Sequence, residues 1–148
     1  GEPWPGGDLM DLWHGTTLLR EFRFDGHNIA LAASDLDPVE CHLMMASHGF
    51  GDGSTIQRIR GWTAEEWDAA HDRLMSRGWL TADGAQTEAG LAARRAVEQE
   101  TDRLASAMER LLGDAAVELA ELLESIRTHL IAAGDVHGVW PPPTVMST

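Results

Sequence analysis

The sequence predicts a mainly α-helical domain organised around residues 52–90, where two short helices, a β-hairpin and the start of a long helix follow one another. Ser54–Gln57 and Thr63–Glu66 both fit the capping-box pattern, in which a hydroxyl and a Glu or Gln three residues later bind two backbone N–H groups. Asp83-Gly84, after the second helix, is a strong signal for a two-residue hairpin turn. This order predicts a winged helix-turn-helix with a two-stranded β-hairpin wing.

Composition favours one soluble domain. A chain of 148 residues suits a single modest core. No apolar run approaches the roughly 18 residues of a membrane span, and the N-terminus does not resemble a signal peptide, so we expect a cytoplasmic location. The single cysteine, Cys41, excludes an internal disulfide and lies in an apolar helix, where we expect it to be a buried small hydrophobe.

The formal net charge of −13 bears most directly on function. Proteins that bind duplex DNA gain much of their affinity by neutralising phosphates with Lys and Arg. The chain as a whole is therefore repelled by nucleic acid, although a local basic patch can override the overall sign.

The N-terminal half predicts two longer helices. Residues 1–7 form a linker rich in Pro and Gly, and a helical pattern of apolar residues begins at Asp8. Gly26 interrupts this pattern before it resumes as far as Asp35, so one kinked helix and two separate helices both remain open. Asp37–Glu40 is the clearest helix start in the chain, with a capping Asp, Pro at the first helical position and Glu at the third; that helix ends at Gly49.

The C-terminal half predicts two more helices, from about Thr87 to Leu112 and from Asp114 to Gly134. A Pro-rich tail over 135–148, with Pro141 to Pro143, favours an extended polyproline conformation. We therefore divide the chain into a linker at 1–7, a winged-helix domain at 8–134 and a tail at 135–148. The terminal helices are more apolar than one small domain needs, which favours a homodimer or a helical partner domain.

Several short motifs point to a family. Arg77-Gly78-Trp79-Leu80 followed by Thr87–Gly90 resembles the MarR-type winged-helix regulators. Residues 18–28 and 60–67 are similar to the actinobacterial SalK-type helix-turn-helix family. The resemblance covers about residues 9–130 and implies a C-terminal domain or a shortened relative, because members of that family are about twice as long. It implies DNA binding only through the fold and brings no established activity.

The DNA-binding interpretation has the second short helix, from Ala64 to Arg77, enter the major groove. Reading helices usually present Arg, Lys, Asn or Gln to the bases, whereas this helix begins with several carboxylates. A solvated acidic face is therefore the simpler interpretation. The basic residues available for a DNA-binding surface are Arg58, Arg60, Arg73 and Arg77.

A polar cluster in the first helix predicts a ligand site. Arg20, Arg23 and His27 share one side if the helix continues through Gly26. Together with aromatic walls, such a cluster suits a flat organic ligand. The alternatives are an internal salt-bridge network and tryptophans that only anchor the core. The full predicted site is Arg20, Arg23, Asp25, His27, Asn28, Arg60, Trp62 and Trp67.

Catalytic and metal-binding motifs are not recognised in the sequence. No two histidines have the spacing that places two ligands on one helical face, and we find no nucleophile elbow, phosphate loop or dinucleotide fingerprint. We therefore predict a non-enzymatic regulatory domain without cofactor or metal, which binds a small organic ligand. The alternative is a DNA-binding transcriptional regulator of MarR type.

Overall fold

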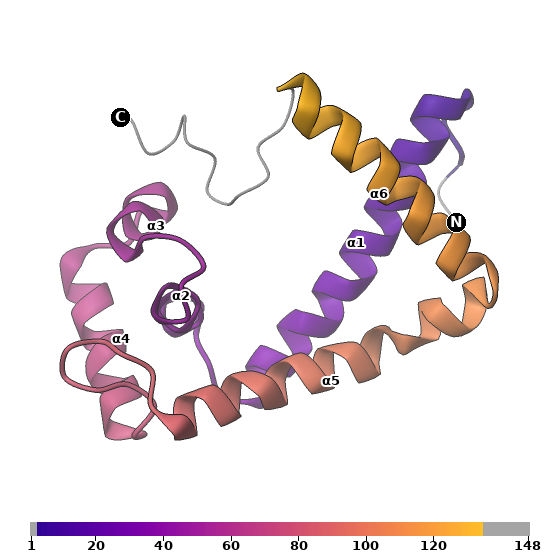
Figure 1. Cartoon of the computed structure of the whole chain (residues 1–148). Helices are drawn as coiled ribbons and strands as arrows, with labels where there is room; N and C mark the ends of the chain where they lie inside the picture. Colours follow the sequence, from indigo (N-terminus) through magenta and orange to yellow (C-terminus); the bar gives the residue numbers. More distant parts are fainter. Residues whose placement is uncertain (1–2, 135–148) are drawn as a thin grey trace.

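The computed structural model describes residues 3–134, and the predicted Pro-rich tail at 135–148 lies outside the described residues (Figure 1). The described part is mainly helical, as predicted, and contains six helices. They are α1 (Asp8–Ala33), α2 (Pro38–Ser47), α3 (Gly53–Arg60), α4 (Ala64–Ser76), α5 (Glu88–Leu112) and α6 (Ala115–Ala133). None of these helices is long and apolar enough to cross a membrane.

The long helices α1 and α5 pack against each other and form what we call the stalk. The first helix runs without a break through Gly26, so one continuous helix is correct. A Cβ atom at Gly26 would lie 3.2 Å from the Cβ atom of Leu104 in α5. Gly26 therefore allows α1 and α5 to approach closely. The interruption that it makes in the apolar pattern of the sequence does not mark the end of a helix.

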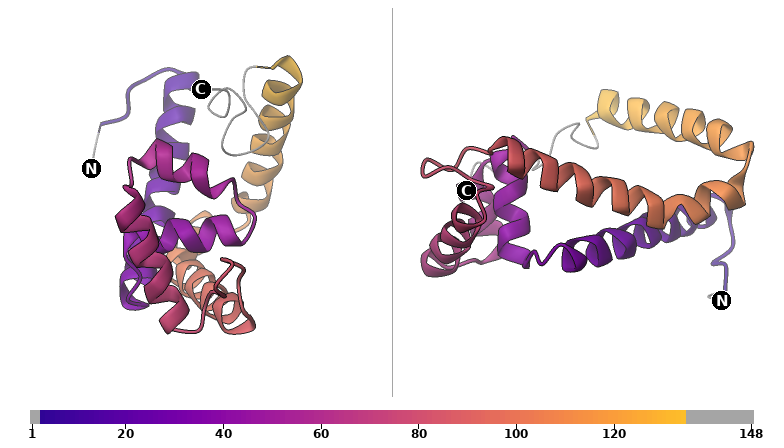
Figure 2. Two further views of the ribbon diagram at one scale, coloured as in Figure 1. Left: turned by 90° about the vertical axis from the view of Figure 1, so that its left-hand side faces the viewer. Right: turned by 90° about the horizontal axis from the view of Figure 1, so that it is seen from below.

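Helices α2, α3 and α4 form a compact head at one end of the stalk (Figures 1 and 2). The predicted capping box between Thr63 and Glu66 at α4 is confirmed. The predicted cap of α2, Asp37, is also confirmed, and it forms a second capping box with Glu40. At α3 the predicted box from Ser54 is wrong. Asp52 caps this helix by accepting the Thr55 N–H at 2.8 Å, because the helix begins at Gly53, two residues before the start that a Ser54 cap requires.

The predicted two-stranded wing is wrong, because residues 3–134 contain no β-strand. Leu80 and Gln86 form one isolated antiparallel bridge, and the turn is closed by a bond of 2.9 Å from the Thr81 N–H to the Ala85 carbonyl. The hydroxyl of Thr87 accepts the Gly90 N–H at 3.0 Å as the cap of α5. The segment after the turn is therefore too short to form a β-strand, since α5 begins directly after it.

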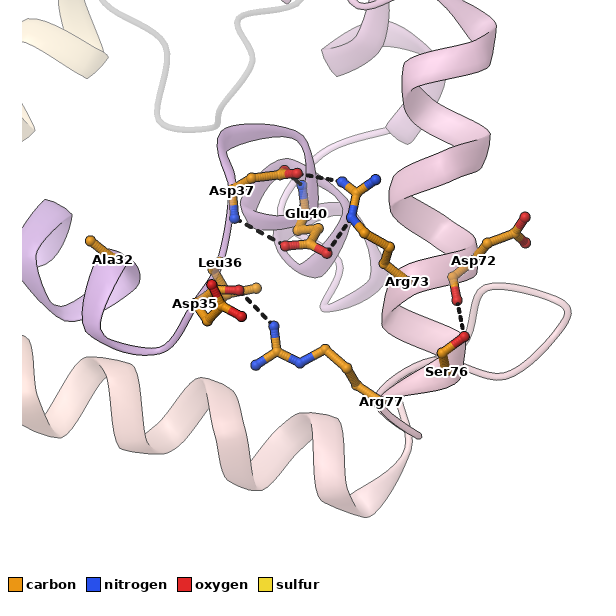
Figure 3. Close-up of a pocket in the computed structure, with 9 residues that line it drawn as sticks. All are labelled: Ala32, Asp35, Leu36, Asp37, Glu40, Asp72, Arg73, Ser76 and Arg77. Atoms are coloured by element: carbon orange, nitrogen blue, oxygen red, sulfur yellow. Dashed lines mark hydrogen bonds and ion pairs between the residues drawn. The ribbon is translucent and has the colours of Figure 1, made fainter.

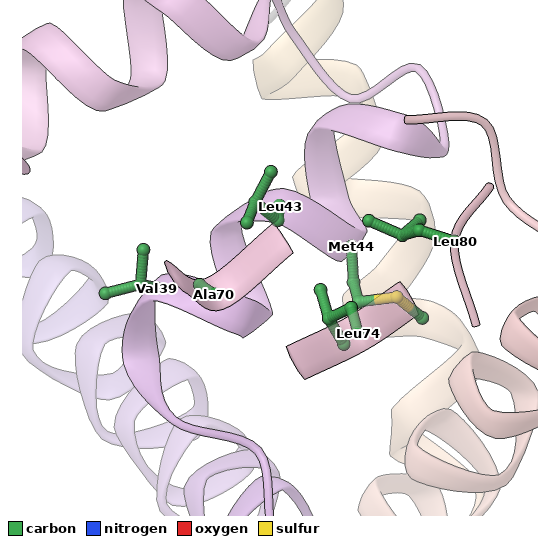
Figure 4. Close-up of a cluster of buried hydrophobic side chains, with 6 residues drawn as sticks. All are labelled: Val39, Leu43, Met44, Ala70, Leu74 and Leu80. Carbon is green, nitrogen blue, oxygen red and sulfur yellow. The ribbon is translucent and has the colours of Figure 1, made fainter. Parts of the chain in front are cut away.

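The core of the head is a cluster of buried side chains from α2, α4 and the loop before α5 (Figure 4). Its members are Val39, Leu43, Met44, Ala70, Leu74 and Leu80. Trp62, Trp67 and Trp79 pack against this cluster from its edge and are partly buried. The tryptophans therefore complete the core of the head.

Helix α6 leaves the far end of the stalk and turns back, with few contacts to α5 (Figure 2). None of its residues is buried. Large apolar side chains are also exposed along α1, among them Leu9 at 77% and Trp13 at 70% of their possible surface. Within the described residues, these apolar side chains of α1 and α6 are therefore left without a covering element.

Candidate functional site

The outer face of α4 is acidic, which is unfavourable for a helix that reads DNA. Glu65, Asp68 and Asp72 are all exposed, and their spacing of three and four residues places them on one side of the helix. Carboxylates in this position would face phosphates of the same charge. The face of α4 that would enter a DNA groove is therefore negatively charged, as the sequence predicted.

Two of the four arginines predicted for DNA binding tie α4 to the rest of the protein (Figure 3). The Arg73 guanidinium pairs with Asp37 and donates from Nε to Oε1 of the buried Glu40 at 2.9 Å. The hydrogen bond to Glu40 and the nearby carboxylates raise the pKa of Arg73. Arg77 donates to the carbonyls of Asp35 and Ser34 at 2.7 and 2.8 Å.

An open groove of about 680 Å³ lies between the end of α1, α2 and α4, and Figure 3 draws the residues that line it. Asp37, Glu40 and Arg73 pair with one another there, and the Arg77 guanidinium lies 3.6 Å from the centre of the Trp79 ring. Both arginines of the groove are therefore engaged within the protein. The other two predicted arginines, Arg58 and Arg60, lie exposed in the last turn of α3.

The residues predicted for the ligand site divide between the stalk and the head. Arg20, Arg23 and His27 border one open groove of about 490 Å³ along α1, while Trp62 and Trp67 belong to the core of the head. Arg23 donates to Asp102 of α5 at 3.0 Å. Asp25 and Asn28 are exposed on α1, and Arg60 is exposed on α3.

The Trp62 indole N–H donates to Nδ1 of His42 in α2 at 3.1 Å. This bond connects the turn between α3 and α4 to the helix beneath it. Burial, together with the positive charge of Arg60, lowers the pKa of His42. The neutral ring is therefore favoured, which is the form that accepts the indole proton.

A second cavity, of about 220 Å³, lies at the junction of stalk and head. Its wall is mostly apolar and comes from α1, α2, α5 and the loop after α2. Polar atoms reach it from His27, Arg94 and Glu98, and the thiol of Cys41 lies on α2, where burial raises its pKa. Small, mostly apolar cavities with a few polar groups are typical ligand sites.

The tautomer of His27 at this cavity follows from its neighbour in α5. Thr101 Oγ1 donates its single proton to the Val97 carbonyl at 2.8 Å, so it has no proton to give to the nitrogen Nδ1 of His27, 3.0 Å away. His27 must therefore donate from Nδ1. In the neutral ring, this leaves Nε2 as a hydrogen-bond acceptor.

Arg94 is the cation at the cavity. Its side chain is 23% exposed, its guanidinium lies 5.3 Å from the centre of the Phe50 ring, and the closest carboxylate oxygen, on Glu98, is 3.8 Å away. A guanidinium held by stacking and by a long ion pair retains donors for an anion. Sequence reasoning missed Arg94, and its only signal was the i, i+4 spacing to Glu98.

Among residues 3–134, no three His, Cys, Asp or Glu side chains gather closely enough to hold a metal ion.

A head of three short helices, with a capped turn between α3 and α4, defines a helix-turn-helix protein. The model of a helix-turn-helix family matches residues 1–137, and the chain belongs to this family. None of the curated proteins and none of the solved structures matches the chain.

Proposed function

We propose that this chain is a non-enzymatic regulatory module, related to the MarR-like and SalK-type proteins, that responds to a small organic ligand bound at the junction cavity. The observation that supports this proposal is the position of the cavity. It is lined by His27 and Arg94 of the stalk and by Cys41 and Met45 of the head. A ligand that contacts both parts favours one arrangement of head and stalk over others.

The chemistry of the wall defines the ligand class. The body of the ligand is apolar and small, because about 220 Å³ is below the usual range of pockets for drug-sized molecules. A carboxylate or another anion binds Arg94, and a hydroxyl donates to Nε2 of His27. The predicted residues Arg20 and Arg23 lie on the neighbouring groove and attract the anion as it approaches.

Calorimetric titration with a series of small aromatic hydroxy acids, beginning with 4-hydroxybenzoate, tests this proposal. We expect Arg94→Gln, which loses a charge-assisted hydrogen bond, and His27→Phe, which leaves the ligand hydroxyl unpaired, each to weaken binding by about tenfold or more. Arg95→Gln is the matched control, since Arg95 is exposed one residue away on α5. The proposal is wrong if the series fails to bind, or if the two cavity variants change stability alone.

DNA binding is the second candidate function, favoured by the fold and by the exposed Arg58 and Arg60 at the end of α3. Binding to the promoter of its own gene, weakened by salt and by Arg60→Ala, would support it. The acidic face of α4 opposes it, so we expect no shift of a promoter fragment at physiological salt.

The same proposal includes a cytoplasmic location and a helical partner. The partner is a second copy of this chain or another helical domain, and it covers the exposed apolar residues of α1 and α6.

A further inference from the structure

Helix α6 carries an apolar stripe that nothing in residues 3–134 covers. Leu122, Ile126 and Leu130 are 57%, 41% and 39% exposed, and a spacing of four residues places them along one side of the helix. Leu119 and Leu123 border the same stripe and are partly exposed. The stripe therefore extends over most of a helix that buries no residue of its own.

From this geometry we infer that α6 packs antiparallel against α6 of a second copy of the chain. The inference rests on the proposed helical partner and names it. Antiparallel packing about a two-fold axis between Glu124 and Ser125 places Leu119 opposite Leu130 of the second copy. It also places Leu123 opposite Ile126 of the second copy, so four of the five stripe residues meet another apolar residue, while Leu122 lies level with Arg127 of the second copy.

Charge along α6 is complementary in this direction. Glu118, Glu121 and Glu124 all lie in its first ten residues, whereas the last nine contain Arg127 and His129 and no carboxylate. In the antiparallel pair, the acidic half of each helix lies against the half without carboxylates. A parallel pair would instead bring the three glutamates of each copy together.

A second copy is favoured over an unrelated domain because the apolar stripe and the charge distribution of α6 are each complementary to themselves in the antiparallel pair. Glu118 and His129 are eleven residues apart, which is three turns, so they lie on the same flank of the helix. Two-fold symmetry brings Glu118 of one chain beside His129 of the other, and it does so twice.

Sedimentation velocity of the full chain, from about 1 to 100 μM in 150 mM NaCl at pH 7.5, tests the inference. We expect a species of twice 16.1 kDa. Ile126→Glu should raise the dimer dissociation constant by about 100-fold, because it buries two charges at the centre of the stripe. Val117→Glu is the matched control, since Val117 is 67% exposed on the opposite side of α6 and should leave the dimer unchanged.

A charge exchange tests the direction of packing. His129→Glu should weaken the dimer by about fivefold, because the new carboxylate lies beside Glu118 of the second copy. Adding Glu118→Lys should restore it. The two positions are about 16 Å apart within one helix, so the rescue must act between chains.

A monomer over the whole concentration range overturns the inference, as does an unchanged dimer in Ile126→Glu or a failed rescue. Circular dichroism of each variant shows whether the helices are retained. Titration with 4-hydroxybenzoate is measured in parallel. A monomer that still binds the acid contradicts the α6 pair alone, while a dimer that does not bind it contradicts the ligand site alone.

Discussion

Arg73 joins α4 to α2 through two carboxylates, and its contacts decide how its substitution should be interpreted. Glu40 is buried, with 5% of its side chain exposed, whereas the Arg73 side chain is 47% exposed. We expect Arg73→Ala to destabilise the protein by about 1–2 kcal/mol, because a buried carboxylate loses its partner while solvent still screens the pair.

Urea unfolding measures this loss, and Arg95→Ala on the exposed side of α5 is its control. Equal stability of Arg73→Ala and the wild type would mean that Arg73 does not hold α4 to α2. Weaker DNA binding by Arg73→Ala alone would therefore not identify a DNA contact.

His42 gives the head a pH dependence whose sign follows from its lowered pKa. The unfolded chain binds a proton at about pH 6.5, and the folded chain binds it only at lower pH. Stability from this residue is therefore complete above about pH 6.5 and is lost as the pH falls through the lower, folded pKa.

The check is urea unfolding at pH 7.5 and 5.5 for the wild type and for His42→Gln. We expect the wild type to lose more stability over this interval, since glutamine does not titrate but can still accept the Trp62 indole proton. Identical losses in the two proteins would contradict the assignment.

Single residues also show how far the sequence predicts the site. The caps Asp37 and Thr63 were predictable because a cap involves neighbours in the sequence. The sequence could not predict that the proposed ligand-site residues divide between stalk and head. His27 contacts Thr101 of α5, whereas Trp62 contacts His42 of α2. These pairings depend on how distant helices pack, and no local pattern encodes them.

Among the elements, the loop before α5 shows why the wing was mispredicted. Asp83-Gly84 correctly marks the reversal of the chain, although the β-turn is closed by a bond of 2.9 Å from the Gly84 N–H to the Thr81 carbonyl and so has Ala82 and Asp83 at its centre. The hydroxyl of Thr87 is already used to start α5 and donates to the Gly78 carbonyl at 2.6 Å. Local turn chemistry predicted the reversal of the chain. The length of the strands depended on where the next helix begins. Helix α5 begins so early that too few residues remain for a second strand.

Glycines in helices have opposite effects according to what surrounds them. A Cβ atom at Gly90 would lie 2.3 Å from the Trp79 carbonyl oxygen, so Gly90→Ala should destabilise the protein by about 2–3 kcal/mol. At Gly15 the nearest atom is in the Trp4 ring at 3.6 Å, which is an ordinary contact. Gly15→Ala should therefore stabilise α1 by about 0.5–1 kcal/mol.

Thermal unfolding of the two variants checks both signs in one experiment. If Gly90→Ala melted at or above the temperature of the wild type, α5 would not approach the Trp79 backbone as closely as described.

For the whole molecule, the sequence predicted the helices and an apolar surface on the terminal helices, but the junction cavity was not predictable. Four segments far apart in the chain build its wall. Each of them contributes apolar residues that look like ordinary core positions in their own helix. Only their assembly leaves space beside Arg94.

Net charge acts on the whole molecule. With 24 acidic and 11 basic residues, the folded chain repels itself. We expect the melting temperature to rise as NaCl increases from about 20 to 300 mM, because salt screens this repulsion. Differential scanning calorimetry measures it, and a fall would mean that the local ion pairs outweigh the net charge.

Arg77 has one consequence for motion. Its guanidinium holds the carbonyls of Ser34 and Asp35, which belong to the connection between α1 and α2, while its own backbone ends α4. Arg77 thereby ties together two connections between stalk and head, the one from α1 to α2 and the one from α4 to α5. A rotation of the head against the stalk that separated these two connections would therefore have to break both hydrogen bonds of Arg77.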